Sequence, residues 1–529
     1  MKLTAAQLIG NLKSTNGANT FHGIDPTSGE KLQPAFYEAT GEEVGQAVQM
    51  AHQAFPIYRK LSAEKRASFL DQIAEEIIAL GNDLISRAMQ ETALAEGRLL
   101  GERGRSCNQL KLFASLIREG SWLDARIDTA DPHRQPFPKP DIRQMHIPLG
   151  PVGIFGASNF PLAFSVAGGD TASALAAGCT IVVKGHPAHP GTSELVGRAI
   201  LRAAEKTDMP EGVFSMVHGT SHAVGMAIVQ HPLIKAIGFT GSFRGGKAIY
   251  DAAVRRAEPI PVYAEMGSTN PMFILPSALA ERGEEIAKGL AASVSLGVGQ
   301  FCTNPGLVIG LDSDENEQFI QQTAAFLSDI TAGTMLTQEI QQAYRSGIKK
   351  LNAIGHVQVV ASGHAANTAY TSTTFLLKST AATLLTHQEL AEEVFGPSTL
   401  SIAAQNKKEL LAVAKSLKGH LTATIHATDA ELEEYRELVE LLQQKVGRLL
   451  INAFPTGVEV GYAMVHGGPF PATTDGRTTS VGTAAIVRFA RPLCYQGFPQ
   501  HLLPEELKDD NPRGIWRMVN GERTKTIIA

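Results

Sequence analysis

At 529 residues the chain is too long for one simple hydrophobic core, so the sequence predicts two or three domains. Hydrophobic residues make up 43% and charged residues 19%, which is a normal balance for a globular protein. The formal net charge of −5 argues against a nucleic-acid partner, and no stretch reaches the roughly 18 apolar residues that span a bilayer.

The four cysteines, Cys107, Cys179, Cys302 and Cys494, lie far apart and include no C-x-x-C pair. No metal site is therefore expected, and so few cysteines argue against a disulfide framework. The N-terminus lacks the continuous apolar region of a signal peptide, so we expect a protein of the reducing cytoplasm.

Residues 40–120 are predicted to be helical. Thr40 and Glu43 have the spacing of a capping box, and apolar residues follow at helical intervals. Ser62 opens a second helix, which Gly81 is expected to end.

From Pro151 onward, short apolar strands alternate with helices. The expected strands are 152–155, 180–183, 213–217 and 235–239, and the expected helices are 164–177, 192–205 and 223–230. This alternation predicts a parallel sheet of Rossmann type.

The remaining segments suggest a connector and a second α/β region. Residues 128–140 are rich in proline and charge and precede an expected edge strand at 145–148. An acidic helix at 430–444 and a strand at 448–452 belong to the second region. Residues 481–495 are expected to form a late strand, suited to a sheet edge or an intersubunit contact.

The segment F-T-G-S-F-R-G-G, residues 239–246, follows a predicted strand and precedes a predicted helix. Glycines in such a place let backbone N–H groups approach a pyrophosphate at the start of the helix. A tight turn without a ligand is the alternative, because glycine-rich turns are common.

Five further residues are chemical candidates, each with a simpler alternative. Cys302 lies in a polar loop suited to an accessible thiolate, although an isolated cysteine is more often a buried hydrophobe. Glu265 ends an apolar strand, where a raised pKa would suit a general base, unless it is merely solvated. Asn159 could donate to an oxyanion or only form a turn. Lys184 and Glu393 could equally be surface charges.

The ordered motifs N-F-P, V-V-K, F-T-G-S, E-M-G, G-Q-x-C and E-x-F-G-P resemble the aldehyde dehydrogenase superfamily, from Ile24 to near Val487. Six motifs in this order form a specific pattern, although each is weak alone. The resemblance implies an α/β aldehyde dehydrogenase fold in three parts. These are a Rossmann-type NAD(P)-binding domain (1–127 and 149–264), an α/β catalytic domain (265–470) and a small β oligomerisation extension (128–148 and 471–529).

The resemblance also implies NAD(P)-dependent oxidation of an aldehyde to a carboxylic acid. Cys302 would be the nucleophile that forms a thioester, and the Asn159 amide and the Cys302 backbone N–H would bind the oxyanion. Glu265 would activate the hydrolytic water. Family members that transfer the acyl group to coenzyme A usually lack this glutamate, so its presence favours a free acid.

Cofactor contacts carried over from the family lie at strand ends and in the loops that follow them. They are Phe155, Gly156, Ala157, Ser158, Lys184, His186, Pro187, Gly219, His222, Gly225, Phe239, Gly241, Ser242, Gly246, Met266, Gly267, Glu393 and Phe395. NAD-specific members often carry glutamate where this chain has Pro187. That carboxylate would repel a 2′-phosphate, so we expect NADP as the preferred cofactor and NAD as the alternative. His186 and His222 could approach the phosphate.

Two departures from the common pattern point to one subgroup. Ser158 replaces a tryptophan, and Gly168–Gly169 stands where many members have W-K. The subgroup contains α-ketoglutarate semialdehyde (2,5-dioxopentanoate, or 2,5-dioxovalerate) dehydrogenases and an NADP-dependent fatty aldehyde dehydrogenase. We expect the short substrate and keep the long-chain aldehyde as the alternative. Arg105 or Arg477 could bind a substrate carboxylate, or be a surface or interface residue.

We expect a small-molecule aldehyde as substrate, a homodimer or homotetramer assembled through the late strand, and no nucleic acid or membrane partner. A catalytically silent, cofactor-binding protein is the competing hypothesis. The intact set of Cys302, Glu265 and Asn159 argues against it, because a silent relative need not keep all three.

Overall fold

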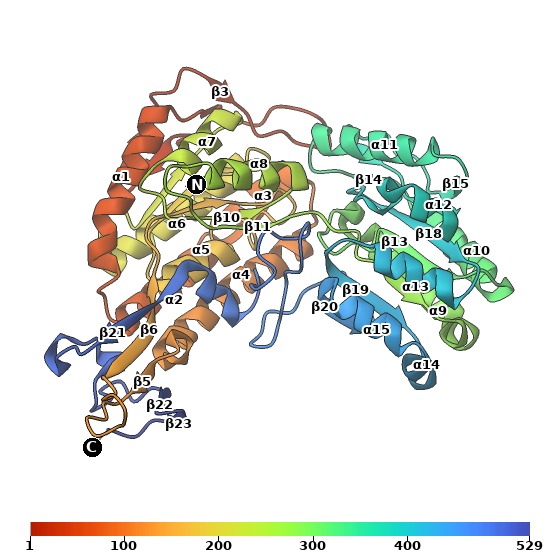
Figure 1. Cartoon of the computed structure of the whole chain (residues 1–529). Coiled ribbons are helices and arrows are strands. Elements are labelled where there is room, and N and C mark those ends of the chain that lie inside the picture. Colours follow the sequence, from red (N-terminus) through yellow and green to blue (C-terminus); the bar gives the residue numbers. More distant parts are fainter. Residues whose placement is uncertain (1, 529) are drawn as a thin grey trace.

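The computed structural model of the chain describes residues 2–528. Figure 1 shows two α/β lobes and an extension of strands at the lower left. The first lobe runs from red to yellow-green along the sequence and the second from green to light blue. The dark-blue C-terminal segment returns to the first lobe and ends in the extension, so the first lobe contains both early and late parts of the chain.

The first lobe is built around a seven-stranded sheet of order β11-β10-β7-β8-β9-β1-β2. Neighbours from β11 to β9 are parallel, whereas β1 is antiparallel to β9 and to β2. The strands are β1 (Gln7–Ile9), β2 (Leu12–Ser14), β7 (Val152–Phe155), β8 (Ile181–Lys184), β9 (Phe214–Val217), β10 (Ala236–Thr240) and β11 (Val262–Glu265). The predicted parallel strands are confirmed.

Helices connect these strands as the alternating pattern predicts. They are α5 (Gly169–Ala177), α6 (Pro190–Lys206), α7 (His222–Gln230) and α8 (Phe243–Val254). The helix expected from residue 164 begins only at Gly169. The preceding segment is a loop because the backbone N–H groups of Leu162 and Ala163 donate to the buried carboxylate of Glu102.

Four helices precede the extension: α1 (Gly41–Tyr58), α2 (Ala63–Ala79), α3 (Gly81–Thr92) and α4 (Glu96–Glu119). Thr40 and Glu43 form both bonds of the predicted capping box, and the Ser62 side chain accepts from the Lys65 backbone N–H. Gly81 has a φ of +55° directly after α2, which confirms it as the point where that helix ends.

The second lobe has its own seven-stranded sheet, of order β15-β17-β18-β13-β12-β19-β20. Its strands are β12 (Met272–Ile274), β13 (Leu307–Leu311), β15 (Gln358–Ser362), β17 (Phe375–Thr380), β18 (Ser398–Ala404), β19 (His420–His426) and β20 (Val446–Ile451). Its helices are α9 (Pro276–Ser295), α10 (Asp314–Ser328), α11 (Gln338–Asn352), α12 (Ala381–Thr386), α13 (Lys407–Ser416), α14 (Asp429–Glu434) and α15 (Arg436–Gln443). The expected acidic helix is therefore two helices, interrupted at Tyr435, whose backbone leaves helical geometry.

The extension is a five-stranded sheet of order β21-β6-β5-β22-β23. Its strands are β5 (Arg126–Asp128), β6 (Ile142–Pro148), β21 (Ala490–Gln496), β22 (Arg517–Val519) and β23 (Glu522–Thr524). The prediction of an edge strand at 145–148 was wrong, because β6 lies between β21 and β5. Two further pairs of short strands are antiparallel: β3 (Thr20–Phe21) with β4 (Phe36–Tyr37), and β14 (Gly333–Thr334) with β16 (Thr371–Ser372).

The late strand starts later than predicted. Residues 483–489 form a 3-10 helix that buries Ile486 and Phe489, and only β21 is a strand. Arg488 in this turn pairs with Asp170 of α5 at 2.5 Å, which fixes the turn on the first lobe. The prediction that β21 lies at a sheet edge is confirmed.

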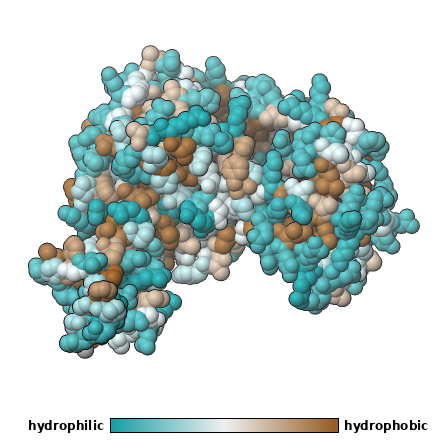
Figure 2. Space-filling model, in the orientation of Figure 1, coloured by the Kyte–Doolittle hydropathy of each residue, from teal (hydrophilic) through white to brown (hydrophobic). Residues whose placement is uncertain are grey.

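The chain crosses from the first lobe to the second between Glu265, the last residue of β11, and Met272, the first of β12. Apolar residues, brown in Figure 2, gather along this junction, whereas hydrophilic residues dominate the outer faces of both lobes. Among residues 2–528, no helix combines the length and the apolar character that crossing a membrane requires.

The buried carboxylate of Glu91 in α3 predicts a measurable stability effect. It accepts from the backbone N–H groups of Gly191 and Thr192, both at 2.8 Å, and from the Thr192 hydroxyl at 2.7 Å. Glu91→Ala would leave these buried donors unpaired, so we expect a loss of roughly 3 kcal/mol in the free energy of unfolding, measured by urea denaturation. Glu75→Ala, at an exposed position of α2, is the control and should change it by less than about 0.5 kcal/mol. Equal losses would contradict the anchoring role.

Candidate active site

Cys302 lies in the loop after α9, half-buried at the junction of the lobes. The buried side chain of Asn270 donates to the carbonyl oxygens of Cys302 and Asn304, both at 2.9 Å. A Cβ at Gly299, whose φ is +64°, would lie 2.3 Å from the backbone of Gly396. Residues 266–271, which join β11 to β12 and are called the crossing segment below, therefore hold this loop on one side. On its other side the loop packs tightly against the residues that follow Glu393.

Asn159 reaches the same loop from the first lobe. Its Nδ2 donates to the carbonyl oxygen of Gln300 at 2.9 Å. The loop that carries Asn159 is fixed by Glu102 of α4, whose carboxylate accepts the N–H groups of Leu162 and Ala163 at 2.8 and 2.9 Å. The structure thus brings Asn159 beside the Cys302 loop, and a buried carboxylate sets its position.

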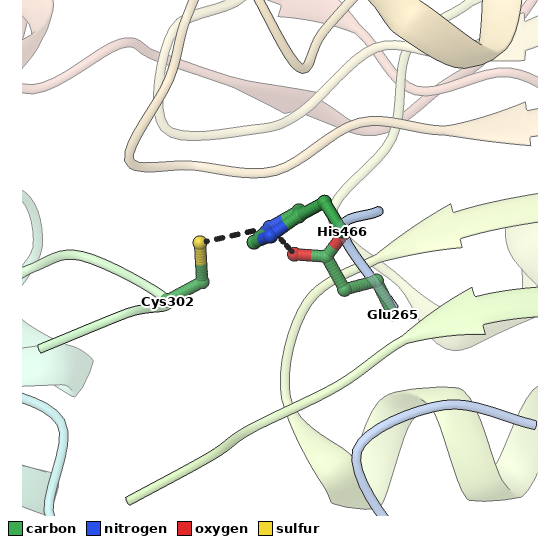
Figure 3. Close-up of side chains that lie close together, drawn as sticks. All are labelled: Glu265, Cys302 and His466. Carbon is green, nitrogen blue, oxygen red and sulfur yellow. Dashed lines mark hydrogen bonds and ion pairs between the residues drawn. The ribbon is translucent and has the colours of Figure 1, made fainter. Parts of the chain in front are cut away.

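Glu265 and Cys302 meet around a third side chain, His466 (Figure 3). The Nε2 atom of His466 lies 2.9 Å from Oε1 of Glu265 and 3.5 Å from Sγ of Cys302. Ser480 donates its hydroxyl to the other oxygen of Glu265. Metals also bind such a set of atoms: a sulfur, an imidazole nitrogen and a carboxylate oxygen, here all within 4.8 Å of one another. The expectation that the protein has no metal site therefore stays a prediction.

The charge state of Glu265 differs from the one expected for a buried strand-end carboxyl. Burial alone would raise its pKa, but His466 and the hydroxyl of Ser480 stabilise the ionised form, so the pKa lies below its usual value. The expectation of a raised pKa was wrong, because His466 and Ser480 lie far from Glu265 in the sequence and only folding brings them into contact with it. Glu265 is therefore ionised at neutral pH and can accept a proton.

Cys302 has the opposite shift. Burial raises the pKa of its thiol well above the ordinary value, and the negative charges of Glu265 and Glu393 raise it further, while Arg105 opposes them. The resting cysteine is therefore a thiol, and a proton acceptor must act when it attacks a substrate.

Sequence reasoning missed His466 and Ser480. His466 stands in M-V-H-G-G-P-F, next to the P-F-P-A-T-T-D-G-R-T-T-S-V-G segment that contains Ser480. A histidine followed by two glycines was the available clue. Its partner Glu265 lies 201 residues earlier, so no local spacing connects the two.

The expected dinucleotide contacts at strand ends lie together in space. Phe155 is in register with Lys184 on one side and with Phe239 on the other, so the carboxyl ends of three adjacent parallel strands coincide. Gly156, Ala157 and Ser158 follow Phe155, and Met266 and Gly267 follow Glu265. Parallel sheets bind nucleotides at such an edge.

The loop after β8 is connected to the loop after β9 through Lys184, whose Nζ donates to the Gly219 carbonyl at 2.7 Å. Burial lowers the pKa of Lys184 to about 8, although Glu38 opposes this. His186 is half-buried, and desolvation, with the nearby His189 and Lys184, holds its pKa well below the usual value, so it is neutral. Pro187 follows it, and His222 is exposed at the start of α7.

Glycines at this edge allow close approaches that a side chain would block. A Cβ at Gly225 would lie 3.2 Å from the Phe155 ring, and one at Gly246 would lie 2.7 Å from Met266. Ser242 is the N-cap of α8 and Gly241 precedes it, so free N–H groups of the first helical turn face this edge. These features fit a bound dinucleotide pyrophosphate.

Glu393 reaches the crossing segment from the second lobe. Its Oε1 accepts the Ser268 backbone N–H at 3.2 Å, and a Cβ at Gly267 would lie 2.2 Å from its Oε2. A pocket beside it is lined by Ser268, Gly299 and Phe395. Glu393 thus lies against the segment that follows Glu265, and Phe395 lines the same pocket as Gly299 of the Cys302 loop.

A half-buried thiol beside a buried carboxylate and an amide donor, next to a parallel sheet of nucleotide-binding type, is an arrangement that suits a dehydrogenase. The chain belongs to the aldehyde dehydrogenase family, whose sequence profile matches residues 13–477. It is an enzyme of the aldehyde-oxidising class, and the predicted family and fold are confirmed.

Two relatives are similar over nearly their whole length. Alpha-ketoglutaric semialdehyde dehydrogenase 2 of Azospirillum brasilense is 50% identical over 523 residues, covering 99% of this chain and 100% of the relative. Alpha-ketoglutaric semialdehyde dehydrogenase of Acinetobacter baylyi is 47% identical and covers 98% of both chains. Betaine aldehyde dehydrogenase of Staphylococcus aureus, solved in complex with NAD+, shares the fold with a TM-score of 0.80 at 20% identity, covering 94% of this chain and 96% of that one.

The raised thiol pKa predicts how Cys302 reacts with iodoacetamide. In a Cys494→Ala background, which removes the exposed cysteine, the alkylation rate should rise with pH and not level off below about pH 9, because only the thiolate reacts. Glu393→Gln removes a nearby negative charge and should shift this curve to lower pH. A plateau near pH 7 in the unsubstituted site would contradict the assignment of a resting thiol.

Proposed function

We propose that the chain oxidises α-ketoglutaric semialdehyde to α-ketoglutarate with a nicotinamide dinucleotide. The observation that carries this proposal is the near full-length similarity to two enzymes of that name. It is supported by the contacts of Cys302 and Glu265 with His466 and by the bond from Asn159 to Gln300, two residues before Cys302. These relatives favour the short substrate over the long-chain aldehyde.

Attack on the aldehyde requires removal of the thiol proton from Cys302. Nε2 of His466 lies between the sulfur and the Glu265 carboxylate, so the proton is taken up by the His466–Glu265 pair as the sulfur bonds to the aldehyde carbon. Ser480 holds the carboxylate from its far side. This relay produces the thiolate only when a substrate is in place.

The aldehyde oxygen becomes an oxyanion when the sulfur adds. The amide of Asn159, which reaches the Cys302 loop at the Gln300 carbonyl, is placed to donate to it together with the Cys302 backbone N–H. A bound nicotinamide would accept the hydride that leaves this carbon. The carbon–sulfur adduct thereby becomes a thioester of Cys302.

Hydrolysis of the thioester needs a base that is ionised near neutral pH. Glu265 meets this condition because His466 and Ser480 keep its pKa low despite burial. Once the proton taken from the thiol has left the pair for solvent, Glu265 accepts a proton from water while the hydroxide adds to the thioester carbon. The Cys302 sulfur then leaves the carbon and takes that proton back from Glu265, which restores the thiol. The product is the free acid.

The dinucleotide would be held by the edge that Phe155, Lys184 and Phe239 share, with its pyrophosphate at the start of α8 and its nicotinamide ribose near Glu393. We propose a preference for NADP, because Pro187 places no carboxylate beside the adenosine ribose. The neutral His186 adds only a weak contact to a phosphate.

We extend the proposal to the domain roles and the assembly. Residues 1–127 and 149–264 would bind the cofactor, residues 265–470 would complete the catalytic site, and the extension would mediate a homodimer or homotetramer. The edge strand β21 supports this, since its unpaired backbone groups can bond to another chain. A cytoplasmic location stays a prediction.

Two variants test the covalent mechanism by rapid mixing of enzyme, NADP and α-ketoglutaric semialdehyde. Cys302→Ala should form no NADPH, because no adduct forms. Glu265→Gln should slow the first-turnover formation of NADPH and lower the steady rate further, by about 100-fold or more, because the variant loses both an acceptor for the thiol proton and the base for thioester hydrolysis. An unchanged steady rate in Glu265→Gln would remove that role, and activity in Cys302→Ala would disprove the mechanism.

Pro187→Glu tests the cofactor preference. The new carboxylate should lower kcat/KM for NADP by about 10-fold and improve the use of NAD, because it repels the 2′-phosphate and accepts from the ribose hydroxyls. Ala188→Glu adds the same charge one residue away and is the matched control. Equal effects of the two variants on both cofactors would show that position 187 does not select the cofactor.

A further inference from the structure

Arg105 of α4 is a cation near the candidate active site that forms no ion pair with any of residues 2–528. Its Nε and Nη2 atoms are buried, and neither makes a hydrogen bond in the described part of the chain. Its guanidinium lies over the Phe164 ring, with Cζ 5.3 Å from the ring centroid. The same ring lies 6.3 Å from the ring of His466, so Arg105 and His466 are both neighbours of Phe164.

The charge of Arg105 also interacts with the thiol of Cys302. Burial lowers the pKa of the Arg105 guanidinium. The nearby groups Cys302, Glu102 and Glu265 oppose this shift, and the exposed Glu459 opposes it as well. Arginine stays protonated at neutral pH even so. A permanent positive charge therefore acts on Cys302.

The neighbouring acidic groups are already engaged. Glu102 accepts the backbone N–H groups of Leu162 and Ala163, and Glu265 is paired with His466. Neither carboxylate makes an ion pair with Arg105 in the described chain. The guanidinium thus keeps its donors for a group that the protein does not supply.

The other arginines near the junction are occupied. Arg98 bonds to the Asn159 carbonyl at 3.4 Å and pairs with Glu102 at 3.5 Å. Arg448 donates to two backbone carbonyls, those of Pro455 and Gly457, at 2.6 and 3.0 Å. Arg477, the other candidate from the sequence, is 89% exposed and pairs with Asp475 at 2.8 Å.

We propose that Arg105 binds the carboxylate of the substrate and thereby selects an aldehyde with a carboxylate at its far end. The inference deepens the proposed function, on which it rests. A guanidinium offers two parallel N–H donors that match the two oxygens of a carboxylate. Stacking on Phe164 fixes the plane of the guanidinium, and the aldehyde end of the same molecule would lie at Cys302.

The polarity of the site agrees with a short oxoacid rather than a long alkyl chain. Burying two unpaired donors of a charged group is unfavourable, and an apolar chain would leave them unpaired. A carboxylate satisfies them and lies far enough from the aldehyde carbon to leave that carbon free for the thiol. Arg105 is therefore a specificity-determining residue.

Steady-state kinetics of Arg105→Gln with two aldehydes test the proposal. For α-ketoglutaric semialdehyde, kcat/KM should fall by about 100-fold, mainly through KM, because the ion pair is lost. For butanal, which has no carboxylate, kcat/KM should fall much less, by under about tenfold, because only the effect of the Arg105 charge on the Cys302 thiol is lost. Arg105→Lys keeps the charge but not the fork, so it should recover part of the lost activity on the carboxylate substrate.

A second readout is independent of turnover. α-Ketoglutarate should slow iodoacetamide modification of Cys302 in the Cys494→Ala background, and this protection should be lost when Arg105→Gln is added. Arg477→Gln, which removes an exposed arginine, is the matched control and should leave both kinetics and protection unchanged.

The outcomes separate the two proposals. An equal fall of kcat/KM for both aldehydes, or protection that survives Arg105→Gln, would overturn the role of Arg105 while leaving aldehyde oxidation intact. A wild-type enzyme that oxidises neither aldehyde would instead overturn the proposed function.

Discussion

The side chain of Asn270 holds together the three segments on which the candidate site depends. It is fully buried, donates to the carbonyl oxygens of Cys302 and Asn304, and accepts from the hydroxyls of Ser268 and Thr422. These contacts connect the crossing segment, the nucleophile loop and strand β19. Because the lobes contribute different groups to the site, this amide network sets the distance between sulfur and base.

Two opposite pKa shifts in one small volume explain how the site can be both stable and reactive. Glu265 is kept ionised by His466 and Ser480, and its charge in turn keeps Cys302 protonated. The two groups therefore do not both carry a negative charge in the resting protein. In the proposed mechanism, transfer of the thiol proton to the His466–Glu265 pair changes this state when the sulfur bonds to a substrate.

Local pattern was sufficient to predict most of the fold. The capping residues Thr40 and Ser62 and the alternation of strands and helices after residue 151 are properties of neighbours in sequence, and the structure confirms them. The 3-10 turn at 483–489 was not predictable, because its cause is the long-range pair between Arg488 and Asp170. The interior position of β6 likewise depends on pairing with β21, far along the chain.

The same distinction holds for the site. Cys302, Glu265 and Asn159 could be named from ordered motifs, and the structure places them together, but His466 is joined to them only by folding. The protonated state of Cys302 also affects how fast this side chain is oxidised. Peroxide oxidises thiolates far faster than thiols, so the raised pKa of Cys302 slows its irreversible oxidation while the thiol stays protonated.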